Sequence, residues 1–460
     1  MPTNDTHDPT LRSWVESAND PAGDFPVQNL PLCAFEAEHD GHTHAHLGVR
    51  IGESVLDVAM LAEAGWFDFE QDEEGIVPSL LHAEDWSMIG AVPQLMGVVR
   101  ARVQEFLLHD APPGGQQGRR LRQKALRPAS ETVFLHPARM ADYTDFYASI
   151  HHASTVGSMF RPDNPLLPNY KHVPIGYHGR SSSIVVSGEP VRRPRGQQGP
   201  PDDKPGQPPT FGPCTMLDYE LEVGAVIGRG NNQGEPVGIA EAGQHLLGLC
   251  LVNDWSARDI QKWEYQPLGP FLAKNFATTI SPYIVTADAL GPFRCPAFAR
   301  SAGDPTPLPY LLDEADQREG GFDITLEAWL QTAQMRERGM VPALLSRSRA
   351  FREMYWTIAQ LIAHHTSNGC NLMPGDLLAS GTVSGPGAGE RGCLLELTWA
   401  GRGPDGKPLP RKPIELPSGE TRLFLQDGDE VILRGHCERE GFARIGFGEC
   451  RGRVEPAAAE

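Results

Sequence analysis

Three acidic residues alternate along one short segment of the chain: Asp218, Glu220 and Glu222. Side chains two residues apart in a β-strand point to the same face, so these carboxylates would share one face and the intervening apolar residues the other. Adjacent carboxylates repel, and nothing local offsets them. Two interpretations stay open: a strand with its acidic face in water, or a site for a hard divalent cation, which favours clustered oxygen ligands.

A second candidate lies where an apolar run ends. Residues 249–252 are apolar, and Asp254 follows just past their end, at the kind of strand-to-loop opening that often carries function. Arg258 comes four residues after Asp254, so the two side chains would be neighbours on a helix. The plainer interpretation is a surface ion pair that opens a helix, which contributes little to stability.

A third candidate combines Asp145 with the histidine pair His151 and His152. Asp145 and His152 are seven residues apart, on one side of a helix if one forms, and histidine is the side chain suited to proton transfer near neutral pH. A structural histidine is the plainer interpretation of either ring. The serines of residues 179–183 lack a G-x-S-x-G elbow, so a Ser-His-Asp hydrolase has little support.

The elements that would hold these residues are mostly short strands. Gly and Pro contribute 49 and 41 of the 460 residues, which suits a β-rich protein with many loops. We expect a polar linker or exposed loop over 111–118 and a domain boundary between residues 1–130 and 131–460. The larger domain should be mainly β, with closed or stacked sheets. The expected elements are strands over 32–35, 46–51, 54–58, 183–187, 217–227, 246–253, 394–399 and 430–434, helices over 98–108 and 352–367, and a long surface loop over 194–213.

Composition limits the partners of the protein. The chain has 59 acidic and 40 basic residues, a formal net charge of −19, which argues against a nucleic-acid binder and weakly against an anionic membrane surface. Most of these acids should form solvated surface. No apolar run is long enough to span a bilayer and no secretory signal is visible, so neither is expected. The eight cysteines contain no C-x-x-C pair, which favours reduced thiols in a cytoplasmic protein.

Several segments together resemble the fumarylacetoacetate hydrolase family. The resemblance runs from about residue 130 to residue 453 and is carried by DYTDFY (142–147), GYHGRSSSIVVSG (176–188), ELE (220–222), NDWSARDIQKWEY (253–265), HHTSNGCNL (364–372) and PGDLLASGT (374–382). It implies a mainly β fold, with a small N-terminal SH3-like β-barrel over 1–130 and a large C-terminal mixed β-sandwich or roll over 131–460. The first 130 residues resemble the family less closely.

The activity implied by this resemblance is metal-dependent hydrolysis of a C–C bond in a small β-diketo acid. The implied reaction splits 4-fumarylacetoacetate into fumarate and acetoacetate, the last step of tyrosine and phenylalanine breakdown, in a cytoplasmic homodimer. Wider relatives act on acylpyruvates and related β-diketones. A decarboxylase, isomerase or hydratase on the same core is an alternative. Another is a non-enzymatic Ca²⁺-binding or scaffold protein, which should have lost the base or a ligand.

The resemblance also implies roles for individual residues. The ligands of the catalytic divalent cation (Ca²⁺ or Mg²⁺, with Mn²⁺ also accepted) would be Asp145, Glu220, Glu222 and Asp254. Lys274 and Thr278 match a second cation subsite, where an ammonium cannot ligate and Lys274 would have to use its backbone carbonyl. Asp218 is left as a bystander or a supporting group.

The remaining implied roles belong to the reaction itself. His152 matches the general base, with His151 as a rival, and Glu396 matches the acid that orients the base. The groups that would stabilise the oxyanion or the carbanion leaving group are Arg258, Gln261 and Lys274. The substrate contacts would be Tyr147, Arg161, Tyr177, Gln261, Tyr265 and Thr382. An anionic substrate further predicts a local positive rim made by Arg161, Arg258 and Lys274.

Overall fold

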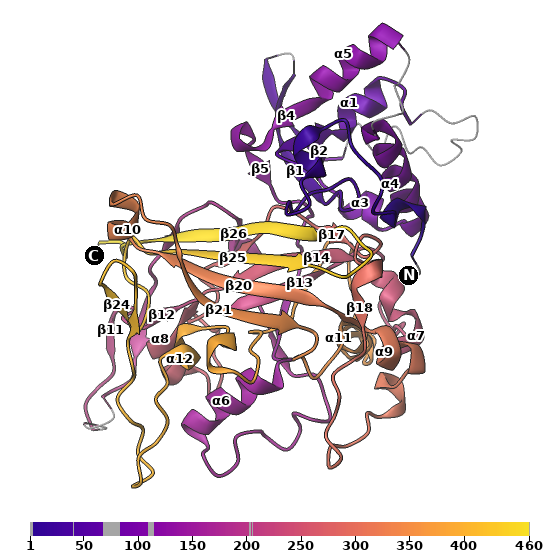
Figure 1. The fold of residues 1–460 in the computed structure, drawn as a ribbon. Coiled ribbons are helices and arrows are strands. Elements are labelled where there is room, and N and C mark those ends of the chain that lie inside the picture. Colours follow the sequence, from indigo (N-terminus) through magenta and orange to yellow (C-terminus); the bar gives the residue numbers. More distant parts are fainter. Residues whose placement is uncertain are drawn as a thin grey trace.

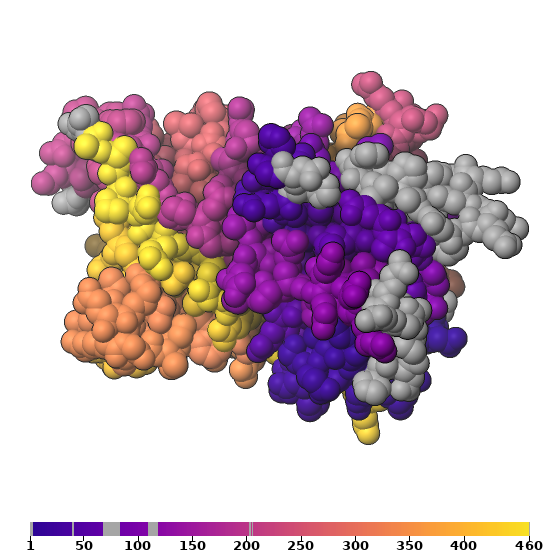
Figure 2. Space-filling model, turned by 90° about the horizontal axis from the view of Figure 1, so that it is seen from above, coloured from indigo at the N-terminus to yellow at the C-terminus, as the bar shows by residue number. Residues whose placement is uncertain are grey.

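The computed structural model describes residues 3–39, 41–67, 83–108, 115–201, 204 and 206–459. A smaller N-terminal part sits against a larger body built on two sheets (Figure 1). Viewed from above, the indigo and purple N-terminal residues lie over this body beside the yellow C-terminal strand (Figure 2). The expectation of a mainly β fold is confirmed.

The N-terminal part contains a five-stranded sheet in the order β4-β3-β2-β1-β5. Its strands are β1 (Leu32–His39), β2 (His42–Ile51), β3 (Ser54–Asp57), β4 (Leu126–Pro128) and β5 (Phe134–Leu135), and its helices are α1 (Val58–Glu63), α3 (Ser87–Gly90), α4 (Pro93–Leu107) and α5 (Gly115–Ala125). The helix expected over 98–108 is thus the second half of α4. Residues 111–114 of the expected linker lie outside the described residues, and α5 begins directly after them.

A mixed eight-stranded sheet forms the centre of the larger body, in the order β7-β6-β22-β13-β14-β16-β8, with β17 pairing β14. The long antiparallel pair β13–β14 is buried at every position, which explains its near-continuous apolar sequence. The pairs β6–β22 and β8–β16 are parallel. The strands are β6 (Tyr143–Phe146), β7 (Gly176–His178), β8 (Ile184–Val186), β13 (Leu221–Ile227), β14 (Leu246–Asp254), β16 (Thr278–Ile280), β17 (Val285–Thr286) and β22 (Leu377–Ala379).

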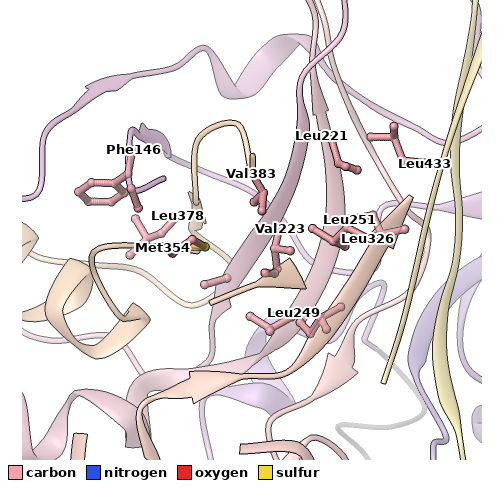
Figure 3. Close-up of a cluster of buried hydrophobic side chains, with 14 of the residues drawn as sticks. Phe146, Leu221, Val223, Leu249, Leu251, Leu326, Met354, Leu378, Val383 and Leu433 are labelled. Atoms are coloured by element: carbon pink, nitrogen blue, oxygen red, sulfur yellow. The ribbon is translucent and has the colours of Figure 1, made fainter. Parts of the chain in front are cut away.

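A second sheet packs on the central one, in the order β21-β20-β25-β26-β9. Leu251 of β14 lies beside Leu326 of β20, and Leu221 of β13 faces Leu433 of β25, within one buried apolar cluster (Figure 3). This core covers one face of β13 and β14. The strands are β9 (Val191–Arg192), β20 (Ile324–Gln331), β21 (Ala343–Ala350), β25 (Glu430–Cys437) and β26 (Ile445–Glu455).

The N-terminal part is joined to the central sheet by backbone and apolar contacts. Leu32 of β1 and Ile284 exchange two backbone hydrogen bonds of 2.9 Å. Leu32 also shares a buried cluster with Val252 of β14 and Ile280 of β16. The N-terminal part therefore covers the face of the central sheet that is turned away from the second sheet.

Shorter elements complete the fold. They are the paired strands β10 (Arg195–Gln198) and β11 (Thr210–Pro213), β12 (Leu217–Asp218) and β15 (Ser256–Ala257), β18 (Arg294–Cys295) and β19 (Gly321–Phe322), and β23 (Ile414–Glu415) and β24 (Thr421–Arg422), with helices α6 (Ile150–Phe160), α7 (Ile239–Ala242), α8 (Arg258–Glu264), α9 (Glu314–Glu319), α10 (Ala333–Glu337), α11 (Ile358–Thr366) and α12 (Leu394–Leu397). Of the helices in the described residues, none combines the length and the apolarity needed to cross a bilayer.

Four sequence-based expectations differ from the structure. The strand expected over 394–399 is wrong, because residues 394–397 form the helix α12. The segment 217–227 is two strands, interrupted at residues 219–220. The surface loop over 194–213 contains the hairpin β10–β11. The helix expected from residue 352 begins only at Ile358, where Thr357 and Gln360 form a capping box.

Candidate active site

Four buried carboxylates converge where β6, β13 and β14 meet. Glu220 lies in the break before β13, Glu222 is on β13, and Asp254 ends the antiparallel partner β14. Asp145 is on β6, which reaches β13 through the intervening strand β22. Ligand-capable oxygens of all four residues lie within 4.8 Å of one another. The fold thus brings together residues from three separate segments of the sequence.

The electrostatics of the cluster differ among its members. Burial first, and then the neighbouring carboxylates, hold the pKa of Asp145 and of Glu222 well above its usual value. Burial also raises the pKa of Asp254, although Lys274 opposes the shift. Glu220 is buried as well, but Lys274 and Arg258 outweigh its desolvation and lower its pKa. Glu220 is therefore the carboxylate that the protein's own cations neutralise best.

Lys274 contacts two of the four carboxylates directly. Its Nζ lies 2.5 Å from Glu220 Oε2 and 2.6 Å from Asp254 Oδ2. Burial would lower its pKa, but the charges of Asp254 and Glu220 raise the pKa above the usual lysine value, so the side chain is an ammonium. Asp254 also accepts hydrogen bonds from Tyr177 OH at 2.7 Å and from Thr278 Oγ1 at 3.2 Å. Lys274 therefore contacts these carboxylates through its ammonium, whereas the expected second cation subsite would use its backbone carbonyl.

Arg258 begins α8 and reaches the cluster from the other side. Its Nη1 lies 2.8 Å from Glu220 Oε1 and donates to Gln261 Oε1 at 3.1 Å, while its Nε donates to Asp218 Oδ2 at 2.9 Å. The helical pairing of Arg258 with Asp254 does not form, because Asp254 ends a strand. Arg258 and Lys274 are both buried against the carboxylates, so two of the three residues expected to form the positive rim lie at the site.

The residues present fit a divalent cation. Both carboxylate oxygens of Glu222 and Oδ1 of Asp145 are buried without a hydrogen-bond partner among the described residues. Lys274 adds one positive charge, and Arg258 is shared with Asp218, so negative charge remains in excess at the four-carboxylate cluster. Buried carboxylates of this kind need a counter-charge, and a hard cation with oxygen ligands supplies it.

A histidine–carboxylate pair lies beside the cluster, on α6 and α12. These helices lie on the side of the larger body opposite the N-terminal part (Figure 1). His152 Nδ1 is 2.6 Å from Glu396 Oε2, and both side chains are buried. Desolvation would raise the pKa of Glu396, but His152 and other partners lower it, so Glu396 is ionised. Since Nδ1 is engaged, Nε2 is the ring nitrogen of His152 that is left for proton exchange.

The structure separates the two adjacent histidines. Asp145 is on β6 and the helix α6 begins at Ile150, so the helical relationship considered for Asp145 and His152 does not exist. His151 Nε2 instead lies 2.9 Å from Glu353 Oε2, and both side chains are partly exposed. His152 alone of the two contacts Glu396, so the geometry favours it over His151 as the base.

The residues expected to contact the substrate lie at different distances from the carboxylate cluster and the His152–Glu396 pair. Tyr147 packs edge-on against the His152 ring at 5.2 Å, and Thr382 Oγ1 is buried without a hydrogen-bond partner in the described part of the chain. Arg161 directly follows α6 as its C-cap and donates to the Pro165 carbonyl. Tyr265 directly follows α8, is 43% exposed, and lies next to Phe160 of α6. No measured contact joins Arg161 or Tyr265 to the carboxylates within the described residues.

Sequence reasoning missed the serines that support the base. Ser149 caps α6, accepting from the His152 backbone N–H, and its hydroxyl donates to the Ser384 carbonyl. Ser384 Oγ in turn donates to Glu396 Oε2 at 2.7 Å. The position of Ser149 three residues before His152 is a helix-start signal that could have been used. Ser384 has no local signal, because its partner lies across a turn on α12.

Known proteins match both parts of the chain. A family model described as fumarylacetoacetase N-terminal matches residues 28–137, and one described as fumarylacetoacetate (FAA) hydrolase C-terminal matches residues 142–455. The fumarylacetoacetase of Bos taurus is 46% identical over 455 residues, covering 97% of this chain and 99% of the relative. Those of Homo sapiens and Oryza sativa subsp. japonica are 44% and 43% identical, each over 97% of this chain, covering 99% and 98% of the relative. This chain belongs to the fumarylacetoacetase family.

Proposed function

We propose that this chain hydrolyses 4-fumarylacetoacetate to fumarate and acetoacetate, the last step of tyrosine and phenylalanine breakdown. The observation that carries the proposal is the buried His152–Glu396 pair next to a cluster of four carboxylates that fits a divalent cation. Similarity to fumarylacetoacetases over nearly the whole chain gives the substrate. The protein is then a hydrolase acting on a C–C bond of a small β-diketo acid.

The proposed cation site uses the four converging carboxylates. Asp145, Glu220, Glu222 and Asp254 would hold Ca²⁺, Mg²⁺ or Mn²⁺, all of which accept oxygen ligands. A cation held there would act as a Lewis acid, which would polarise the keto groups of the substrate and withdraw charge from the departing enolate. Thr278 and Lys274 would orient Asp254, since both donate to its carboxylate.

His152 is the proposed base. Glu396 holds Nδ1, so Nε2 takes a proton from a water molecule whose oxygen attacks the substrate carbonyl carbon. The new C–O bond completes the fumarate carboxyl group as the C–C bond breaks. The electron pair of that bond passes to the acetoacetate fragment, and the proton held by His152 is returned to its carbon. The hydroxyl group of the water thus enters fumarate, and its proton enters acetoacetate.

The buried cations and polar groups would stabilise the charge that develops. Arg258, Gln261 and Lys274 are proposed to face the oxyanion and the leaving enolate, where each such donor contributes about 3 kcal/mol in comparable sites. The two buried cations are already held by carboxylates, so they need little reorganisation. The proposed substrate contacts are Tyr147, Arg161, Tyr177, Gln261, Tyr265 and Thr382.

The finer architecture and the assembly are also part of this proposal. Residues 1–130 would form an SH3-like β-barrel, in keeping with their small antiparallel sheet, and residues 131–460 a mixed β-sandwich or roll, in keeping with two packed sheets. The family resemblance supports a homodimer in the cytoplasm. Sedimentation of the purified protein would test the dimer.

Turnover of two substrates with and without a chelator tests the proposed function. Purified protein is offered fumarylacetoacetate and an acylpyruvate, and loss of the diketone absorbance is followed. We expect rapid loss with fumarylacetoacetate, abolition by chelator, and recovery when Ca²⁺ or Mg²⁺ is added. Turnover unaffected by chelation, or confined to the acylpyruvate, would contradict the proposal. The metal content of the purified protein identifies the cation.

A further inference from the structure

We propose that Asp218 is a positioning residue that fixes the catalytic arginine and the catalytic histidine relative to one another. This inference rests on the proposed function and concerns the same site. Asp218 ends β12, directly before the break that carries Glu220, and its side chain is fully buried. It touches neither the proposed base nor the unpartnered ligand oxygens, so its effect on the reaction passes through other residues.

One set of contacts orients Arg258. The Nε and Nη2 of Arg258 both lie 2.9 Å from Asp218 Oδ2. This contact holds the Nε side of the guanidinium and leaves Nη1 directed at Glu220 and Gln261. A hydrogen bond between a charged donor and a charged acceptor, such as the one from Arg258 Nε, is shorter and stronger than one between neutral groups. The orientation of Arg258 toward the reacting centre is therefore set from behind by Asp218.

A second set of contacts orients the helix that carries Glu396. Asp218 Oδ1 accepts the backbone N–H of Leu394 at 2.8 Å, and Oδ2 accepts that of Leu395 at 2.9 Å. The residue before this helix, Cys393, makes no side-chain cap of its own. Asp218 thus replaces the missing cap from a distant strand. Glu396 is the next residue of the helix, and it holds His152 Nδ1 at 2.6 Å.

Only a carboxylate can make all of these contacts. Every hydrogen-bond partner of Asp218 is a donor: the backbone N–H groups of Tyr219, Leu394 and Leu395, and the guanidinium of Arg258. An asparagine would place its NH₂ group against one of these donors and would leave the buried arginine without its counter-charge. Asp218→Asn therefore weakens the contacts that orient Arg258 and those that orient the helix carrying Glu396, while it changes few atoms.

The chain offers a matched control for this substitution. Asp429 is a buried carboxylate that also takes two donors from one arginine, Arg422, at 2.8 and 2.9 Å, and one backbone N–H, from Gln426. None of these residues belongs to the site. Asp429→Asn should lower thermal stability as Asp218→Asn does but leave kcat unchanged, so it separates loss of stability from loss of positioning.

The experiment measures kcat, KM, cation affinity and the thermal midpoint for both variants and for wild type. We expect Asp218→Asn to lower kcat roughly 10- to 100-fold, as removal of a supporting partner commonly does. KM should change by less than about threefold, because the lost interactions act in the transition state. A kcat within about twofold of wild type, with a stability loss like that of Asp429→Asn, would overturn the inference.

A double-mutant cycle gives the decisive readout. If Asp218 acts through Arg258 and Glu396, its replacement should cost much less kcat in an Arg258→Lys or Glu396→Gln background than in wild type. Fully multiplicative losses in both backgrounds would overturn the inference. Asp218→Glu keeps the charge and shifts the carboxylate by one methylene, so it takes the place of Asp218→Asn if that variant does not fold. An inactive wild type would contradict the proposed function instead.

Discussion

The imidazole of His152 and the carboxylate of Glu396 meet through a 2.6 Å contact between Nδ1 and Oε2 in a buried setting. Ser384 donates to the same carboxylate oxygen, which fixes Glu396 from a second direction. This arrangement holds the imidazole so that Nε2 faces away from the pair. The neighbouring His151 has the same chemistry but a different partner, and this difference gives the first prediction.

Replacement of His152 by alanine should lower kcat by about 10²- to 10⁴-fold, the usual contribution of a positioned base. Cation affinity, measured by calorimetry, should persist because the four carboxylates remain. His151→Ala is the matched control and should retain kcat, since His151 pairs with Glu353. If His151→Ala removes turnover and His152→Ala does not, the base has been assigned to the wrong histidine.

Replacement of Glu222 by glutamine should have opposite effects on thermal stability with and without bound cation. Burial and neighbouring carboxylates raise the pKa of Glu222 in the folded protein. Its contribution to folding stability is therefore complete below its unfolded-state pKa of about 4.5 and is lost as the pH rises. At pH 8 the cation-free variant should therefore melt higher than cation-free wild type. Wild type should gain about 2.7 kcal/mol at a cation concentration 100 times Kd, and the variant little.

The matched control for Glu222→Gln is Asp405→Asn, which removes an exposed carboxylate. It should alter neither the melting temperature of the cation-free protein nor the stabilisation by cation. If Glu222→Gln keeps the full stabilisation by cation, Glu222 is not a ligand.

Replacement of Lys274 by methionine should reduce turnover without weakening the cation site. The ammonium lies between Glu220 and Asp254 and repels any cation nearby, so its removal should tighten cation binding measured by calorimetry. Loss of one charge-stabilising donor should lower kcat by about 10²- to 10³-fold. Weaker cation binding in Lys274→Met would contradict this account of the ammonium.

Asp316 gives a pH dependence that is independent of the catalytic site. Burial raises its pKa to about 6, although Thr357 donates to both of its oxygens. A raised folded pKa means that its contribution to stability is complete below about 3.8 and is lost as the pH rises through about 6. Asp316→Asn should remove this loss, which is at most about 3 kcal/mol.

Urea unfolding at pH 4.5 and pH 8 measures this effect. The variant should gain stability relative to wild type at pH 8 and much less at pH 4.5. An equal difference at the two pH values would show that ionisation of Asp316 does not govern its contribution.

Local patterns in the sequence located some of the site and not the rest. The alternation of Glu220 and Glu222 and the end of the apolar run at Asp254 could be seen directly, because each involves residues that are close together in the sequence. Asp145 joins them only through the parallel pairing of β6 with β22, which no spacing between residues reveals. The family resemblance supplied its role in place of the pattern.

The misassigned strand at residues 394–399 has a similar physical cause. An apolar run of this length suits a strand, but Asp218, 176 residues earlier in the chain, accepts the N–H group of Leu394 and starts a helix there. A contact between such distant residues overrides local preference. The same contact explains why Asp218 looked like a bystander in the sequence.

The contact of Leu32 with Ile284 links the N-terminal part to the strands that carry the proposed site. The cluster around Leu32 includes Val252 and Ile280, which lie two residues from Asp254 and Thr278 on the same strands. A methyl group lost near Leu32 can therefore shift a carboxylate that lies two residues farther along the same strand, on the same face of the sheet. The N-terminal part contributes none of the proposed site residues, but its packing supports the strands that carry them. Substitutions in the N-terminal part can therefore impair activity without altering any residue of the proposed site.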